Sequence, residues 1–175
     1  MSTPEFSRPI RVDTLGGTPP ILSLEADEAE RRALARRFGF VEIKRLAAEV
    51  AVTRTGEAVT ARGTVSAALA QSCVATGKPV EETVDEPFEV EFRPQPVSGG
   101  GEEEVELGDG ELDVVFYDGA AIDIGEAVAE TLFLSVAPYP RAPGAEAALR
   151  DAGVKSEEEA GPFAALAALR DKLEP

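Results

Sequence analysis

The sequence contains no histidine among its 175 residues and only one cysteine, Cys73. Ser-His-Asp and Cys-His catalysis, His-Glu zinc sites and histidine acid-base chemistry all need an imidazole, so the sequence excludes enzymes of these classes. One cysteine cannot form an internal disulfide or supply a cysteine-based metal cage within one chain. Chemistry that uses carboxylates alone, as in a magnesium site or a glycosidase pair, stays open.

The sequence also has no long apolar run, and we expect no secretory segment. No stretch approaches the roughly 18 apolar residues of a membrane span, and the N-terminus, Met1–Arg11, is too polar for a signal peptide. We therefore expect a cytoplasmic protein with no membrane partner. The length of 175 residues and the 43% of hydrophobic residues favour a single domain over residues 1–175, with a core over about 8–140.

Acidic residues outnumber basic ones by 33 to 17, and the excess lies in the second half of the chain. Residues 1–80 hold 11 Lys or Arg and 9 Asp or Glu, a net charge of +2, which leaves 6 basic and 24 acidic residues, a net charge of −18, for 81–175. Such asymmetry suggests one surface suited to a polyanion and another suited to a basic protein. Solubility alone is an alternative explanation of the acidic excess.

Alternation of apolar and polar residues predicts an antiparallel β-meander of long strands. Turn residues between the first two long strands indicate a hairpin. The expected strands are 21–24, 43–53, 59–69, 80–84, 88–92 and 112–117.

Three segments have the pattern of helices, and the third lies in the C-terminal segment described below. Residues 27–38 begin with acidic residues and end before Gly39, and residues 124–134 follow a capping box formed by Asp123 and Glu126. The second helix is apolar around most of its circumference, so we expect it at the centre of the fold. The predicted fold class is α+β, with a meander or barrel-like sheet packed by this central helix, a short N-terminal helix and a C-terminal helix.

Two acidic segments complete the expected organisation. Residues 94–110 contain two prolines, three consecutive glycines and clustered glutamates, which together predict an acidic loop. The C-terminal segment 154–175 combines an acidic linker with a last helix that Pro162 opens. The candidate contacts for a basic protein in the loop are Glu102, Glu103, Glu104 and Glu106.

The only concentrated positive patch lies on the first helix and the start of the strand after it. Its candidate phosphate contacts are Arg31, Arg32, Arg36, Arg37, Lys44 and Arg45. A solvated helix face with ion pairs Asp27–Arg31 and Glu28–Arg32 is the alternative. No aromatic residue lies between these arginines to stack on an unpaired base, so the sequence predicts contact with a nucleic-acid backbone only.

Carboxylates on the central helix offer a candidate metal site. Glu126 and Glu130 lie four residues apart and could share a divalent ion with nearby aspartates, but nothing matches a calcium loop, and a solvated helix stripe is preferred. The aspartates concerned are Asp113, Asp118 and Asp123. Cys73 has no histidine to generate a thiolate and is expected to be a small, semi-buried side chain. We predict no cofactor, no metal and no catalytic residue.

Three stretches, taken in order, resemble the YceD family of large ribosomal RNA subunit accumulation proteins. They are Gln71–Val80 after the second long strand, Ile122–Leu132 in the central helix, and Gly161–Arg170. Many members of that family carry a Cys-x-x-Cys in the first stretch, whereas Thr76 stands at the second cysteine position here, so a thiol or zinc role does not carry over. The family-motif positions are Cys73, Asp123, Glu126, Pro162 and Phe163.

The resemblance implies a non-enzymatic ribosome biogenesis factor that supports accumulation of 23S rRNA and assembly of the large subunit, with a precursor of that subunit as its partner and no role for DNA. Two mechanisms stay open: the arginine helix could touch rRNA, or the acidic half could engage a basic ribosomal protein. The net charges of −18 and +2 favour the second. The alternatives are a small enzyme with carboxylates and a divalent metal, and an acidic interaction scaffold unrelated to ribosomes.

Overall fold

The computed structural model describes residues 4–16, 20–96 and 113–155. Its contacts divide the chain into two compact units, the first made of 1–71 and 81–138 and the second of 72–80 and 139–175. The expected acidic loop and the expected C-terminal helix lie outside the described residues, apart from a few at their edges. One domain over 1–175 stays a prediction.

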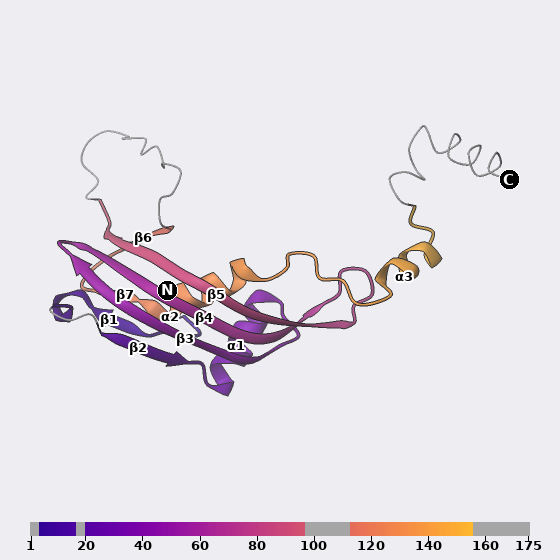
Figure 1. Cartoon of the computed structure of the whole chain (residues 1–175), viewed down its shortest axis with the longest axis horizontal. Helices are drawn as coiled ribbons and strands as arrows, with labels where there is room; N and C mark the ends of the chain where they lie inside the picture. Colours follow the sequence, from indigo (N-terminus) through magenta and orange to yellow (C-terminus); the bar gives the residue numbers. More distant parts are fainter. Residues whose placement is uncertain (1–3, 17–19, 97–112, 156–175) are drawn as a thin grey trace. The chain divides into compact units, whose positions relative to one another are not determined.

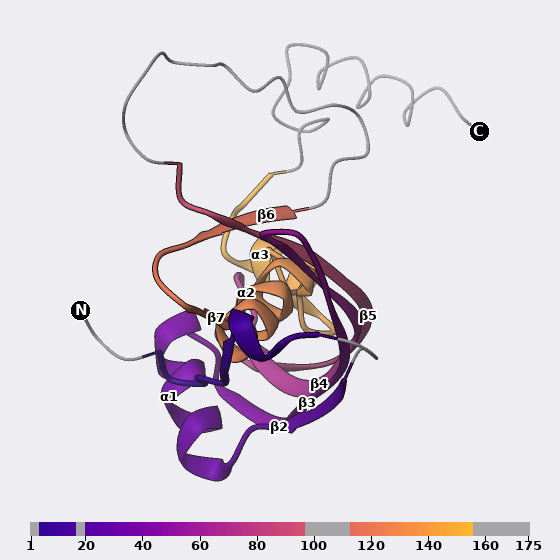
Figure 2. The same cartoon turned by 90° about the vertical axis from the view of Figure 1, so that its left-hand side faces the viewer.

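A five-stranded sheet forms the first unit, in the order β2-β3-β4-β5-β6. Figure 1 shows its three long strands side by side, and Figure 2 shows the sheet curving around helix α2. The strand bounds are Ile21–Glu25 for β2, Glu42–Thr55 for β3, Ala58–Ser72 for β4, Pro79–Pro94 for β5 and Asp113–Tyr117 for β6. The predicted α+β class with a meander-like sheet of long strands is therefore confirmed, and the sheet does not close into a barrel.

The last strand departs from a purely antiparallel meander. Strand β6 pairs in parallel with β5, with Val90 opposite Asp113 and Pro94 opposite Tyr117. Parallel neighbours need a connection of about a dozen residues or more, and residues 95–112 supply that length. The sequence pattern identifies the strand but not its direction, because alternation is the same in both orientations.

A bulge in β3 sets which side chains near its start reach the surface. The register against β4 shifts between Ile43 and Arg45, so Ile43 and Leu46 are both buried while Lys44 and Arg45 are both exposed. In an uninterrupted strand Lys44 would share a face with Leu46 and would point into the core. The extra residue therefore keeps both cations in solvent.

Helices α1 (Glu28–Phe38) and α2 (Ile124–Ser135) complete the first unit's core. Asp27 and Glu30 form a capping box at the start of α1, and Gly39 ends it in the left-handed region at φ 72°. Buried residues of α2, among them Val128 and Leu132, belong to one core cluster with buried residues of α1 and of the sheet. The expected central helix thus packs as predicted.

Short elements flank this core. A short 3-10 helix, Val12–Thr14, follows strand β1. Strands β1 (Pro9–Arg11) and β7 (Ala121–Asp123) pair antiparallel and bring the N-terminal segment to the start of α2. The second unit contains helix α3 (Ala145–Asp151). There Cys73 packs against Ala142 and against Ala145 at the start of the helix.

Candidate nucleic-acid interface

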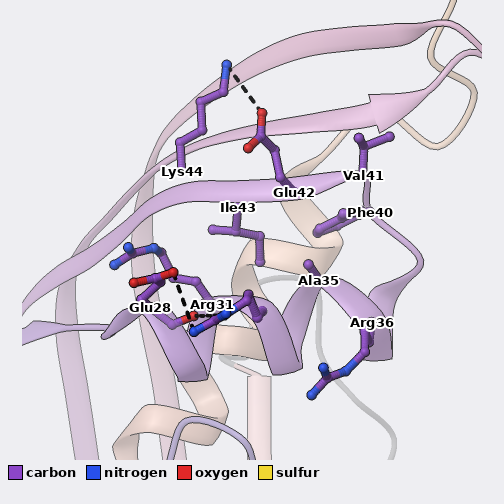
Figure 3. A pocket seen from close by; sticks show the side chains of 10 residues that line it. Glu28, Arg31, Ala35, Arg36, Phe40, Val41, Glu42, Ile43 and Lys44 are labelled. Atoms are coloured by element: carbon purple, nitrogen blue, oxygen red, sulfur yellow. Dashed lines mark hydrogen bonds and ion pairs between the residues drawn. The ribbon is translucent and has the colours of Figure 1, made fainter.

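A hollow of about 600 Å³ lies between α1 and the start of β3, and we call it the arginine hollow (Figure 3). Apolar side chains, including those of Phe40 and Ile43, form part of its wall. Its charged lining residues are Glu28, Arg31, Arg32, Arg36, Glu42 and Lys44. Four cations against two carboxylates make this surface positive, in contrast to a chain whose net charge is −16.

Helical periodicity explains which arginines share the hollow. Successive residues are about 100° apart around a helix, so Arg31, Arg32 and Arg36 lie on one side of α1, and Arg37 turns away from them. Buried Leu34 occupies the opposite side and anchors the helix to the core. The helix therefore divides the four predicted arginine contacts into three and one.

Arg37 forms ion pairs with other parts of the chain. Its guanidinium donates to the two carboxylate oxygens of Glu126 at 3.0 and 2.6 Å and to Glu5 at 3.0 Å. These bonds, foremost the one with Glu126, raise the pKa of Arg37 above its usual range against the opposing effect of partial burial. Arg37 thus joins α1, α2 and the N-terminal segment, and its side chain is only 32% exposed.

The remaining arginines of the helix have weaker attachments. Arg31 donates to the carbonyl of Ala26 at 2.6 Å, and Arg32 lies 3.4 Å from Glu28 with both side chains largely exposed. The expected Glu28–Arg32 pair therefore forms, whereas Asp27 accepts from the Glu30 amide at 2.8 Å instead of meeting Arg31. Arg36 is exposed and has no carboxylate partner among the described residues, and no dashed line reaches it in Figure 3.

The two cations of β3 lie in different surroundings. Lys44 lines the arginine hollow, but its ammonium is 2.6 Å from Glu81 and 3.6 Å from Glu42, and the bond to Glu81 raises its pKa. Arg45 donates to the Ser66 hydroxyl at 3.4 Å and lines a separate hollow of about 430 Å³. The structure thus gathers Arg31, Arg32, Arg36 and Lys44 and leaves Arg37 and Arg45 outside.

The family-motif carboxylates are structural contacts in this fold. Asp123 accepts from the backbone N–H of Arg8 at 2.7 Å, from the Ser7 hydroxyl at 2.5 Å and from the Glu126 amide at 3.2 Å. These bonds hold the N-terminal segment against the start of α2, and Glu126 is occupied by Arg37. Motif positions Pro162 and Phe163, like the candidate glutamates Glu102, Glu103, Glu104 and Glu106, lie outside the described residues.

Neither a metal cluster nor an accessible thiol is found in the part of the chain that the structure describes. There, no group of three or more His, Cys, Asp or Glu side chains could hold a metal ion. Burial and the charge of Glu126 raise the pKa of Glu130.

The Cys73 residue is 3% exposed. Its sulfur accepts a hydrogen bond from the Ala142 N–H at 3.3 Å, and this bond, together with one from the Thr76 hydroxyl, lowers the pKa of the thiol to about 7.

An aromatic cluster beside the hollow escaped the sequence analysis. The ring of Phe133 on α2 stacks on Phe38 with centroids 4.9 Å apart and lies 6.3 Å from Phe40. Because Phe133 is far from the arginines in sequence, only the packing of α2 against α1 brings it there. The sequence feature that could have indicated this cluster is the adjacent apolar pair Phe133 and Leu134, which lies at the end of an otherwise buried helix.

Comparison with known proteins identifies the family. No helix in the described ranges is long and apolar enough to cross a membrane. No curated protein and no solved structure matches the chain. The family model described as large ribosomal RNA subunit accumulation protein YceD matches residues 61–170, which begin after the arginine hollow and include α2. Since this match covers more than half of the sequence, the chain belongs to the YceD family, whose name indicates a role in the accumulation of large-subunit ribosomal RNA.

Proposed function

We propose that this protein supports accumulation of large-subunit rRNA without catalysis, by binding the RNA phosphate backbone at the arginine hollow. The observation that carries the proposal is the pair Arg31 and Arg36, whose guanidinium groups have no carboxylate partner among the described residues. A guanidinium presents a planar set of donors that matches phosphate oxygens, and such charge-assisted bonds are stronger than neutral ones.

The charge of the surroundings supports this assignment. Glu28 lies near Arg32, and Glu42 and Glu81 lie near Lys44, so the carboxylates close to the hollow already have cationic neighbours. The chain as a whole is acidic and repels polyanions. Binding of RNA is therefore expected at this face and not over the whole surface.

A non-catalytic mechanism follows from contacts of this kind. Phosphate contacts provide affinity and position a nucleic acid but do not read its sequence. A protein that covers a segment of precursor RNA protects that segment while ribosomal proteins assemble on it. Such protection raises the amount of the RNA without any bond being made or broken by the protein.

The test compares two double variants with the same change of charge. Arg31→Gln/Arg36→Gln removes two of the four cations of the hollow, whereas Arg62→Gln/Arg150→Gln removes two exposed arginines that pair with Glu89 and Glu146. Fluorescence anisotropy with labelled large-subunit rRNA fragments measures affinity as a function of salt. We expect the first variant to lose about 10-fold or more in affinity and to lower the salt slope by roughly 1 to 2, because two phosphate contacts disappear. Equal losses in both variants, or no binding by the unmodified protein, contradict the proposal.

The acidic half supports a second candidate, binding of a basic ribosomal protein. The observation in its favour is the net charge of −18 over residues 81–175. Replacing Glu102, Glu103, Glu104 and Glu106 by Gln should then weaken capture of basic ribosomal proteins and flatten its salt dependence, while Arg31→Gln/Arg36→Gln should leave capture unchanged. The reverse ranking favours the RNA mechanism alone.

A further inference from the structure

We propose that the arginine hollow takes single-stranded RNA in preference to duplex RNA, with an unpaired base stacked on Phe133 beside the phosphates that Arg31 and Arg36 hold. The inference rests on the function proposed above and adds the class of RNA and the residue that selects it. It also reverses the expectation, drawn from the sequence, that no aromatic residue is available to a base at this site.

Phe133 is a fixed and accessible ring. It stacks on Phe38 with an interplanar angle of 24°, yet 47% of the residue is exposed. Because its neighbours already hold the ring, stacking a base on it costs little further conformational entropy. An exposed aromatic side chain that is held in this way is the feature with which proteins stack unpaired bases.

Phe133 is linked to the hollow through a neighbouring ring. Phe40 lines the hollow and contacts Phe133 with ring centroids 6.3 Å apart. Val41, also in the lining, is 54% exposed, and Leu134 next to Phe133 is 76% exposed. Phe40 therefore connects the lining of the hollow, to which Arg31 and Arg36 also belong, with the ring of Phe133.

The charges around the hollow favour RNA over an apolar partner and indicate how the RNA is oriented. A purely apolar partner would leave the cations of the hollow without a counter-charge, whereas RNA carries phosphates and aromatic bases side by side. Glu130 lies one turn before Phe133 on α2, and its carboxylate repels phosphates on that side. The backbone of the RNA must then follow the hollow while a base reaches Phe133.

Duplex RNA could make the phosphate contacts of this arrangement but not the stacking contact. Its bases are paired and stacked within the helix, and they cannot lie on an external ring without being flipped out. The phosphates of a duplex could still meet the arginines. The proposal therefore predicts a difference between single and double strands that depends on Phe133 and not on Arg36.

The experiment uses the full-length chain with labelled single-stranded and duplex RNA of equal length. Phe133→Ala should weaken single-strand binding about 10-fold and leave duplex binding unchanged, while Phe116→Ala, which removes an exposed ring on β6, should change neither. Phe133→Trp, which keeps an aromatic ring at this position, should retain the single-strand binding that Phe133→Ala loses. Since the chain has no tryptophan, the fluorescence of this variant reports the ring directly, and we expect quenching by the single strand only. A melting curve for each variant verifies folding.

The outcomes separate this inference from the function on which it rests. If both RNAs bind, both are lost in Arg31→Gln/Arg36→Gln and neither responds to Phe133→Ala, the hollow binds phosphates and the stacking inference is wrong. If neither RNA binds, both proposals are wrong. If Phe133→Ala leaves RNA binding intact but abolishes co-sedimentation with ribosomal precursor particles, the aromatic patch binds a protein and the inference is overturned.

Discussion

We propose opposite roles for two neighbouring arginines of α1, stabilisation of the fold by Arg37 and RNA binding by Arg36, and substituting each one tests this proposal. Arg37 donates three hydrogen bonds to Glu126 and Glu5, whereas Arg36 is exposed without a carboxylate partner among the described residues. We predict that Arg37→Gln lowers stability and spares RNA affinity, and that Arg36→Gln lowers RNA affinity and spares stability. The two variants carry the same change of charge and are one residue apart.

The expected loss for Arg37→Gln follows from its surroundings. Removing one partner of a fully buried pair costs about 3–5 kcal/mol, and exposed pairs contribute about 0–1 kcal/mol. The Arg37 side chain is 32% exposed, Glu126 24% and Glu5 34%, which places this network between the two limits. We expect a loss of about 1–2 kcal/mol, or roughly 2–8 °C in melting temperature for a chain of this size. For Arg36→Gln the change should stay within about 0.5 kcal/mol.

Urea unfolding followed by circular dichroism measures the stability, and anisotropy with labelled RNA measures the affinity. The m-value should be unchanged in both variants, because neither alters the surface exposed on unfolding. Equal destabilisation by the two substitutions would contradict the assignment of Arg37 to the internal network. Loss of RNA binding in folded Arg37→Gln, with binding intact in Arg36→Gln, would refute the placement of the phosphate site.

Three further outcomes are expected. Gly125→Ala should destabilise the protein by about 2 kcal/mol or more in urea unfolding, because a Cβ there would lie 2.3 Å from the Phe6 carbonyl oxygen; an unchanged midpoint would show that the N-terminal segment does not lie against α2. The guanidinium of Arg8 donates to both carboxylate oxygens of Glu30, at 2.6 and 2.9 Å, and these hydrogen bonds lower the pKa of Glu30 below its ordinary 4.5. The stability that ionised Glu30 contributes is therefore present above pH 4.5 and is lost as the pH falls through the depressed pKa, so Glu30→Gln should flatten the acid limb of the curve of unfolding free energy against pH. Cys73→Ser should retain RNA binding and rRNA accumulation with only a small loss of stability, since the thiol is 3% exposed; a folded variant without these activities would assign Cys73 a chemical role.

The sequence by itself determined the local structure and the classes of chemistry. Alternation along 43–53 and 59–69 identified the long hairpin, and Asp27 with Gly39 marked the ends of α1, because periodicity and caps are set by residues close together in the chain. The capped start of α2 and its central place followed in the same way. The absence of histidine excluded imidazole chemistry without any knowledge of the fold.

Tertiary structure alone decided which of these residues meet. Arg36 and Arg37 have the same sequence context, and they differ because Glu126, 89 residues away from Arg37, lies beside only one of them. The bulge that turns Lys44 outward depends on register with β4, and the parallel direction of β6 depends on its pairing with β5. Phe133 meets Phe38 and Phe40 for the same reason. Such contacts arise from the packing of a shared core, which no local pattern contains, because the free energy of burial depends on how much apolar surface leaves water and not on which residues cover it.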